Sequence, residues 1–188
     1  MKIILTRHGE TVGNLKNILE GGRVQGKLSK LGFQQIKKLA LRLKKEKFDF
    51  VYSSDLKRAK DTTLEIMKYH SDIPIKFVKD VREQDLGDFT GKHHDSVDWN
   101  NKPKNFETRE HIQKRAIKFI DKIYRKHKNQ IVLLVAHAIF NKALITGILG
   151  KHTDLMDEID QKNTCVNILE IREDKKHTVH LMNCTKHL

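Results

Sequence analysis

The chain of 188 residues is long enough to bury a sizeable core, and we expect a single domain over residues 1–188. With 38% hydrophobic and 32% charged residues, and no apolar run near the roughly 20 residues of a membrane span, the composition predicts a soluble protein of the cytoplasm without a signal peptide. The formal net charge of +13 favours an anionic partner, although most of the excess comes from lysines scattered along predicted helices.

Two segments near the start of the chain carry clear signals of secondary structure. Residues 2–5 (KIIL) form a short apolar run with β-branched side chains, which predicts a buried strand. Residues 29–47 predict a helix that Ser29 opens, with lysines on the side opposite an apolar stripe. The stripe consists of Leu28, Leu31, Ile36, Leu39 and Leu43.

The next segments continue the alternation of strands and helices. Residues 48–54 (FDFVYSS) predict a second strand. Residues 56–70 predict a helix, for which Ser54 or Asp55 is the expected N-cap. Residues 75–80 (IKFVKD) predict a third, short strand.

Residues 81–105 have no hydrophobic period, and they contain two glycines and a proline. A loop of this length inside a compact domain is usually functional or mobile, so we expect residues of about 84–105 to cap the substrate. Helical spacing returns over residues 107–128, where one face is apolar. That face consists of Ile112, Ala116, Phe119, Ile120 and Ile123.

The last third of the chain completes the pattern. Residues 130–137 (QIVLLVAH) form the most apolar predicted strand, and residues 138–150 predict a helix. Residues 164–171 and 177–184 alternate well enough for a closing antiparallel pair. This order of elements predicts an α/β fold, a three-layer α/β/α sandwich with a mostly parallel central sheet.

Arginine and histidine side chains occupy three predicted strand ends, the edge where parallel sheets bind ligands. The first strand runs into Arg7, His8 and Gly9, and the most apolar strand ends at His137. Arg58 lies in the first turn of the helix after the second strand. Arginine suits the oxygens of a phosphoryl group, an unprotonated imidazole can attack its phosphorus, and Gly9 would let the backbone approach closely. These strand ends therefore predict a phosphate site.

Glu83 lies at the start of the irregular segment and supplies the acid that such a site needs. A leaving alkoxide needs a proton, which a carboxyl group can donate. Taken alone, each of these residues has an ordinary explanation, such as a structural histidine, a solvated arginine or a surface carboxylate. Their combination favours a catalytic site.

Four stretches of the sequence contain the candidate site residues. In chain order they are TRHGET (6–11), YSSDLKRAKDT (52–62), REQDLGDFTG (82–91) and LVAHAIFNKAL (134–144). Their order and spacing resemble the histidine phosphatase superfamily, also called phosphoglycerate mutase-like. The resemblance covers nearly the whole chain and favours the phosphatase branch. It implies the phosphoglycerate mutase-like form of the α/β/α sandwich.

The resemblance implies a role for each matching residue. His8 would be the nucleophile that becomes phosphohistidine, and Glu83 would be the proton donor. Arg7, Arg58 and His137 would bind the phosphoryl group and stabilise its transition state. The resemblance also implies that the reaction uses no metal and no other cofactor.

The resemblance also covers residues that would contact the substrate, but there the sequence matches the family pattern less closely. Asn14 matches a polar contact to phosphate, and Glu20 with Gly21 matches a stretch that contacts the substrate. The backbone N–H of Ala138 would contact the phosphate, although the family usually has glycine at this position. Lys142 also stands where arginine is common, and Phe89-Thr90-Gly91 stands where Trp-Glu-Gly is common. These departures leave the substrate open.

The remaining histidines and cysteines that could bind a metal are better explained as ordinary surface residues and reduced thiols. The pairs His93–His94 and His177/His180 lack a cysteine or carboxylate set that would complete a site, so we interpret them as loop and strand-surface histidines. Cys165 and Cys184 lie far apart without metal-type spacing and are expected to be reduced thiols.

The sequence therefore predicts a metal-independent phosphomonoester hydrolase that acts on a small phosphorylated metabolite through a phosphohistidine. A phosphoglycerate mutase-type phosphoryl transferase is the first alternative, and the short segment after the acid argues against it. A non-catalytic basic module that binds nucleic acid or a phosphoprotein is the second, and the aromatic content of only 6% argues against nucleic acid. The identity of the substrate and the choice between monomer and homodimer stay open.

Overall fold

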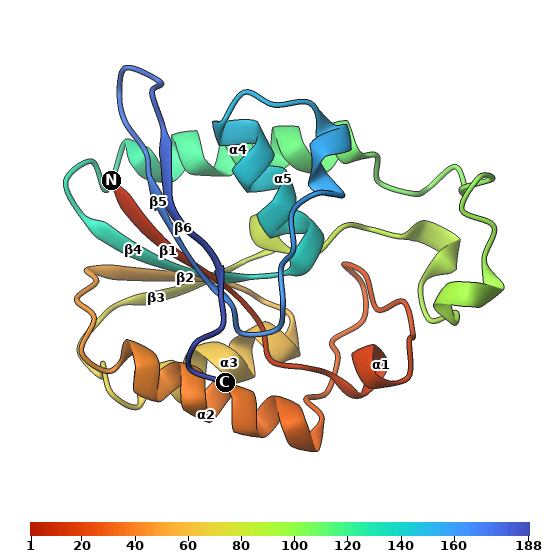
Figure 1. The fold of residues 1–188 in the computed structure, drawn as a ribbon, viewed down its shortest axis with the longest axis horizontal. Coiled ribbons are helices and arrows are strands. Elements are labelled where there is room, and N and C mark those ends of the chain that lie inside the picture. Colours follow the sequence, from red (N-terminus) through yellow and green to blue (C-terminus); the bar gives the residue numbers. More distant parts are fainter.

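Six strands form one sheet in the computed structural model, which describes residues 1–188 (Figure 1). The strand order is β3-β2-β4-β1-β5-β6, and the strands are β1 (Lys2–Arg7), β2 (Phe50–Ser54), β3 (Ile75–Val78), β4 (Ile131–Ala136), β5 (Val166–Glu170) and β6 (Thr178–Cys184). Strands β1, β2, β3 and β4 pair in parallel, whereas β5 runs antiparallel to both β1 and β6. The predicted mostly parallel sheet with an antiparallel closing pair is confirmed.

Helices cover both faces of the sheet, which confirms the three layers. In Figure 1, α2 (Lys30–Leu43) and α3 (Lys57–Met67) lie on one face, and α4 (Arg109–Tyr124) and α5 (Ala138–Ile148) lie on the other. Successive side chains of a strand point to opposite faces of the sheet, so each strand contributes to the hydrophobic cores on both faces. In β1, Ile4 packs into the cluster that includes α2 and α3, whereas Ile3 and Leu5 pack into the cluster that includes α4 and α5.

The structure corrects several predicted helix boundaries. Ser29 caps α2 as expected and accepts a hydrogen bond from the N–H of Gly32, but α2 ends at Leu43 instead of residue 47. Leu31 was expected on the buried stripe, yet it is 49% exposed, because it lies on the solvent side of the first turn. Helix α4 spans Arg109–Tyr124, within the predicted range 107–128.

The predicted cap of α3 is wrong. The N-cap is Leu56, which makes no side-chain cap hydrogen bond. Asp55 instead binds the guanidinium of Arg82 with two hydrogen bonds of 2.6 and 2.7 Å. Ser54 accepts from the N–H of Leu56 at 3.3 Å, but Leu56 is the N-cap residue itself, so this bond satisfies none of the N–H groups of the first turn.

Several short elements carry no hydrophobic period and were not predicted. Helix α1 (Val12–Leu15) follows β1, and 3-10 turns occupy Lys79–Val81, Gly87–Phe89, His94–Ser96 and Thr153–Met156. The first of these turns replaces the end of the predicted strand 75–80, which stops at Val78.

Residues 84–105, the cap segment, are docked on the loop that follows α1, beyond the carboxyl ends of the parallel strands (Figure 1). Backbone hydrogen bonds join Gly91 N–H to the Leu19 carbonyl at 2.7 Å and Leu19 N–H to the Lys92 carbonyl at 2.9 Å. The rings of Phe89 and Trp99 pack edge to face within the segment, with centroids 5.6 Å apart. The segment therefore has a defined shape despite its lack of period.

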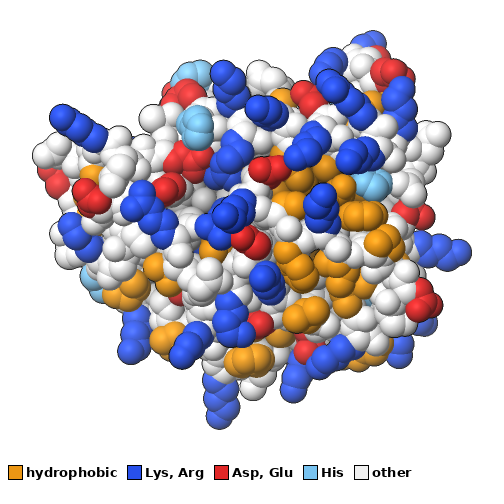
Figure 2. Space-filling model, turned by 180° about the vertical axis from the view of Figure 1, so that it is seen from behind, with side chains coloured by type: hydrophobic (Ala, Val, Ile, Leu, Met, Phe, Trp, Pro, Cys, Tyr) orange, Lys and Arg blue, Asp and Glu red, His pale blue; other side chains and the backbone are white.

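Charge is distributed broadly over the surface. On the face shown in Figure 2, Lys and Arg side chains are interspersed with acidic and apolar ones, without one continuous basic area. No helix is both long and apolar enough to cross a membrane.

Burial on α2 gives a direct stability test. Leu39 is fully buried and Leu41 is 59% exposed on the same helix. Because only Leu39→Ala opens a cavity, it should lower the free energy of unfolding by about 2–5 kcal/mol, whereas Leu41→Ala should change it by about 0.5 kcal/mol or less. Urea denaturation followed by circular dichroism measures both, and similar losses would contradict the described packing of α2.

Candidate functional site

The two histidines of the site meet because β1 and β4 are neighbours in parallel register. Arg7 is aligned with Ala136, and the N–H of His8 donates to the carbonyl of Ala136 at 3.1 Å. His8 and His137 leave the sheet side by side, with ring centroids 5.1 Å apart. Residues 129 positions apart in sequence are thus in contact because parallel strands end at one edge of the sheet.

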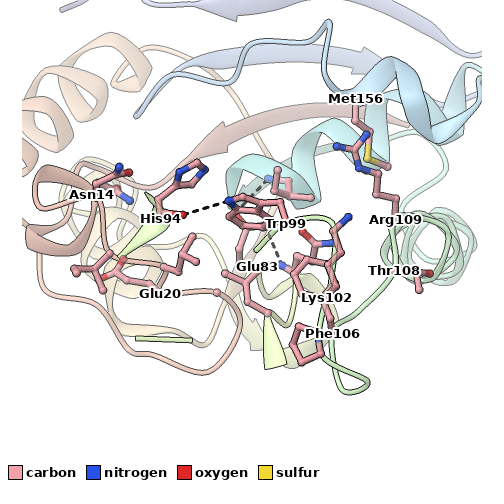
Figure 3. A pocket seen from close by; sticks show the side chains of 18 of the residues that line it. Asn14, Glu20, Glu83, His94, Trp99, Lys102, Phe106, Thr108, Arg109 and Met156 are labelled. Carbon is pink, nitrogen blue, oxygen red and sulfur yellow. Dashed lines mark hydrogen bonds between the residues drawn. The ribbon is translucent and has the colours of Figure 1, made fainter. Parts of the chain in front are cut away.

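A cavity of about 800 Å³ opens at this edge (Figure 3). Among its lining residues are seven that the sequence predicts for the site, Arg7, His8, Asn14, Glu20, Gly21, Arg58 and Glu83. His137 and Ala138 are not among the residues that line the cavity, but the fully buried ring of His137 lies 5.1 Å from the ring of His8, which does line it. Phosphate contacts by these two residues therefore stay a prediction.

The hydrogen bonds of His8 identify its reactive nitrogen. Its Nδ1 lies 2.7 Å from the carbonyl oxygen of Gly9. A carbonyl only accepts, so Nδ1 carries the hydrogen and Nε2 keeps its lone pair in the neutral ring. Nε2 accepts a hydrogen bond from Nε of Arg58 at 3.1 Å. Burial, reinforced by Arg58 and Arg7, holds the pKa of His8 well below its usual range, so the ring is neutral.

Arg58 is held by backbone carbonyls and not by a carboxylate. Nη1 donates to the Val24 carbonyl at 2.6 Å, and Nη2 donates to the Gly21 carbonyl at 2.8 Å. The nearest carboxylate oxygen paired with it, Oε2 of Glu20, is 4.0 Å away. Burial lowers the pKa of Arg58 from its very high normal value, and the side chain is 1% exposed. A desolvated cation of this kind attracts an anion strongly.

Arg7 and His137 add buried polar atoms without partners. Nη1 of Arg7 donates to the carbonyl of Gln161 at 2.8 Å, while its Nε has no partner. Both ring nitrogens of His137 lack partners as well. Burial, followed by the charges of Arg58 and other neighbours, lowers the pKa of His137 well below its usual range. Unpaired buried nitrogens are rare in folded proteins, and here two of them belong to a ring whose centroid lies 5.1 Å from that of His8.

Glu83 is fixed at the N-terminus of α5. Its carboxyl oxygens accept hydrogen bonds from the N–H groups of Ile139 at 3.2 Å and Phe140 at 3.0 Å, and Oε1 also accepts from Gln84 N–H at 3.0 Å. The first N–H groups of a helix have no acceptor within the helix, so a carboxyl group satisfies them. The helix that begins with Ala138 thereby fixes the acid at the cavity that His8 also lines.

Asn14 and Glu20 have structural partners besides bordering the cavity. Asn14 and the N-cap residue Thr11 form a reciprocal capping box on α1. Oε2 of Glu20 accepts a hydrogen bond from the hydroxyl of Thr11 at 2.8 Å. Gly21 contributes its carbonyl to Arg58. These three residues therefore connect the cavity wall to the start of α1 and to Arg58.

The structure gives Gly9 a packing role that the sequence did not predict. A Cβ on Gly9 would lie 2.6 Å from Cγ2 of Ile36 and 2.9 Å from the carbonyl oxygen of Gly32, both on α2. Glycine is required here because α2 packs closely against the backbone, and a close approach to a phosphoryl group stays a prediction.

The outer wall of the cavity comes from the cap segment and from residues that follow it in sequence, and it was not predicted residue by residue. Figure 3 shows Trp99, Lys102 and Arg109 around the cavity. Arg109 is neutralised by two hydrogen bonds to Asp157 of 2.9 and 2.8 Å. Nζ of Lys102 lies over the ring of Phe106, 5.4 Å from its centroid. Aperiodic loop residues give no signal that would have identified them from sequence.

The histidine pairs lie on the surface. His94 bonds to Asp95 at 3.0 Å, and His180 bonds to Glu170 at 2.9 Å. No group of three or more His, Cys, Asp or Glu side chains is arranged to hold a metal ion. Both cysteines are free thiols, and burial raises the pKa of Cys165 to about 11.

Comparison with known proteins gives a consistent assignment. The model of the histidine phosphatase superfamily (branch 1) matches residues 3–185. The phosphatase PhoE of Bacillus subtilis is 31% identical over 181 residues, covering 92% of this chain and 90% of that protein. A metal-independent phosphoserine phosphatase of Arabidopsis thaliana is 30% identical over 190 residues, covering 93% and 78%. The structure of YhfR from Bacillus stearothermophilus superposes with a TM-score of 0.90 at 26% identity, covering 99% and 98%.

The two buried neutral histidines make stability depend on pH. Their pKa values are lowered by folding from the usual 6.5, so below pH 6.5 the unfolded chain binds protons that the folded chain does not. The free energy of unfolding should therefore fall as the pH drops below this value, with a slope that rises toward about 1.4 kcal/mol per pH unit for each histidine as the unfolded chain becomes fully protonated. Urea titrations at pH 6.5, 6.0 and 5.5 measure how the free energy of unfolding changes with pH. In His137→Gln this change should be smaller by the contribution of one histidine. An unchanged slope would contradict a neutral His137.

Proposed function

The chain belongs to branch 1 of the histidine phosphatase superfamily, and we propose that it is a metal-independent phosphatase of small phosphorylated metabolites that works through a phosphohistidine at His8. The observation that carries this proposal is the tautomer of His8. Nδ1 is bonded to the Gly9 carbonyl, so the lone pair of Nε2 faces Arg58 at the base of the cavity. A neutral imidazole among fixed cations suits nucleophilic attack on a phosphoryl group.

In the first step, Nε2 of His8 gives up its hydrogen bond from Nε of Arg58 and forms a bond to phosphorus, as the bond from phosphorus to the ester oxygen breaks. The electron pair of that bond leaves on the oxygen, which takes a proton from Glu83. Arg7 and Arg58 bind the phosphoryl oxygens and supply the positive charge that a metal would otherwise bring. His137, with two unpaired ring nitrogens beside His8, gives one further hydrogen bond to these oxygens.

In the second step, the Glu83 carboxylate accepts a proton from water while the water oxygen attacks phosphorus. The bond from phosphorus to Nε2 breaks, its electron pair returns to His8, and inorganic phosphate leaves. Glu83 acts as acid and then as base because the second step reverses the proton movement of the first. Its fixed position on α5 supports both roles.

The substrate class rests on the size of the site and on relatives. The cavity of about 800 Å³ suits a metabolite and is bordered by both apolar and cationic side chains. Relatives are named for phosphoserine in Arabidopsis thaliana and for α-ribazole in Escherichia coli. Because those alcohols differ, we propose the class of small phosphomonoesters without choosing one alcohol.

A substrate screen tests the proposal. Phosphate release from a panel of phosphoserine, phosphoglycerates, sugar phosphates and α-ribazole phosphate should identify at least one substrate. On it, His8→Ala should lower kcat by roughly 10³-fold or more, because the nucleophile is lost. Turnover by His8→Ala close to that of the wild type would contradict the role of His8. Interconversion of phosphoglycerates that outpaces phosphate release would favour the mutase.

Leaving groups of different basicity test Glu83. Glu83→Gln keeps one acceptor oxygen for the amides of α5 but cannot give up a proton, so it should lower the phosphorylation rate with an alkyl phosphate by about 10²–10⁴-fold. With p-nitrophenyl phosphate, whose leaving group needs no proton, the loss in the burst rate should be much smaller. Equal losses with both substrates would remove Glu83 from the acid role.

A further inference from the structure

Residues 161–164 (QKNT), the strap, cross the backbone of Arg7 and His8 just beyond the end of the β1–β5 ladder. The last ladder pair is Thr6 with Val166. Beyond it, the N–H of Thr164 donates to the carbonyls of Arg7 at 3.1 Å and His8 at 3.4 Å. The carbonyl of Gln161 accepts from Nη1 of Arg7 at 2.8 Å. The strap thus continues to hydrogen-bond the chain at Arg7 and His8, beyond the point where the pairing of β1 with β5 ends.

The backbone of the strap is held in an uncommon conformation at Thr164. Its φ is +57°, in the left-handed region that β-branched residues rarely adopt, and the residue is fully buried. Such conformations persist where the surrounding contacts fix them, and they cluster at functional sites. In this conformation the N–H of Thr164 points toward the carbonyls of Arg7 and His8.

The amide of Asn163 links His8 to the opposite wall of the cavity. Its Nδ2 donates to the carbonyl of His8 at 3.1 Å and to Oδ1 of Asn14 at 3.4 Å. Both partners are oxygens that only accept, so the site requires two N–H donors. Asn163 itself does not border the cavity, whereas His8 and Asn14 do.

A buried amide network anchors the other end of the strap. Oε1 of Gln161 accepts from Nδ2 of Asn141 at 3.1 Å and from Nδ2 of Asn167 at 3.0 Å. Nε2 of Gln161 donates to Oδ1 of Asn167 at 2.9 Å. The three side chains are at most 5% exposed, and they tie the strap to α5 and β5. The strap therefore has a rigid base from which Asn163 reaches His8.

We propose that Asn163 is a positioning residue, which fixes the His8 backbone so that Nε2 remains in line with the bond it attacks. The inference rests on the proposed role of His8. Because Asn163 lies outside the cavity, its loss should slow phosphoryl transfer and leave phosphate binding by Arg7 and Arg58 intact. Misalignment of a nucleophile by about 1 Å can cost up to about 100-fold in rate.

The test compares two variants with a matched control. Asn163→Ala removes the amide, and Asn163→Asp keeps its shape without the N–H donors. Asn129→Asp makes the same chemical change at an exposed residue before β4, at the other end of the sheet. Rapid-quench measurements give the rate of His8 phosphorylation, inhibition by inorganic phosphate reports binding, and thermal denaturation reports folding.

Both Asn163 variants should slow phosphorylation by roughly 10–100-fold while Asn129→Asp stays near the wild type. The inhibition constant for inorganic phosphate in Asn163→Ala should stay within about twofold of the wild type, because the arginines are untouched. Phosphorylation at the wild-type rate in both variants, or a loss of phosphate binding as large as the loss of rate, would overturn the positioning role. A wild-type protein that forms no phosphoenzyme would instead overturn the proposed function.

Discussion

The hydrogen bond from Nδ1 of His8 to the Gly9 carbonyl is the contact on which the site depends, because it leaves Nε2 as the nitrogen with a lone pair. The bond requires that the backbone at Gly9 stay in place, and two contacts ensure this. Helix α2 packs so closely that a Cβ on Gly9 would collide with Ile36. The N–H of Gly9 donates to the hydroxyl of Thr62 on α3 at 3.1 Å. The tautomer of one ring thus follows from how two helices pack on the sheet.

The cations of the site are oriented mainly by backbone carbonyls, and the carboxylate paired with Arg58, that of Glu20, is 4.0 Å from it. Backbone carbonyls hold Arg58 and Arg7, whereas Arg82 and Arg109 at the periphery are paired with Asp55 and Asp157. A carbonyl fixes a guanidinium through a dipole and leaves its net charge available to an anion. In a buried site that charge acts over a low dielectric, so a phosphoryl group with two negative charges would be bound strongly and in one orientation.

The sequence was sufficient wherever a regular pattern governs structure. Apolar runs located β1 and β4, and the parallel arrangement brought Arg7, His8 and His137 together at one edge. The sequence was insufficient where contacts between distant segments determine the role of a residue. The ion pair of Asp55 with Arg82 displaced the expected cap of α3, and the packing of α2 explains Gly9. The strap at 161–164 also has no local signature, because its hydrogen bonds to Arg7 and His8 span more than 150 positions.

The central claim is that Nε2 of His8 receives the phosphoryl group. The direct measurement is to trap the phosphoenzyme by rapid mixing with substrate, locate the phosphate by mass spectrometry, and identify the phosphorylated nitrogen by ³¹P NMR of the denatured protein. We expect one acid-labile phosphate per chain, on Nε2 of His8, and none in His8→Ala. Phosphate on Nδ1, or on another residue, would contradict it.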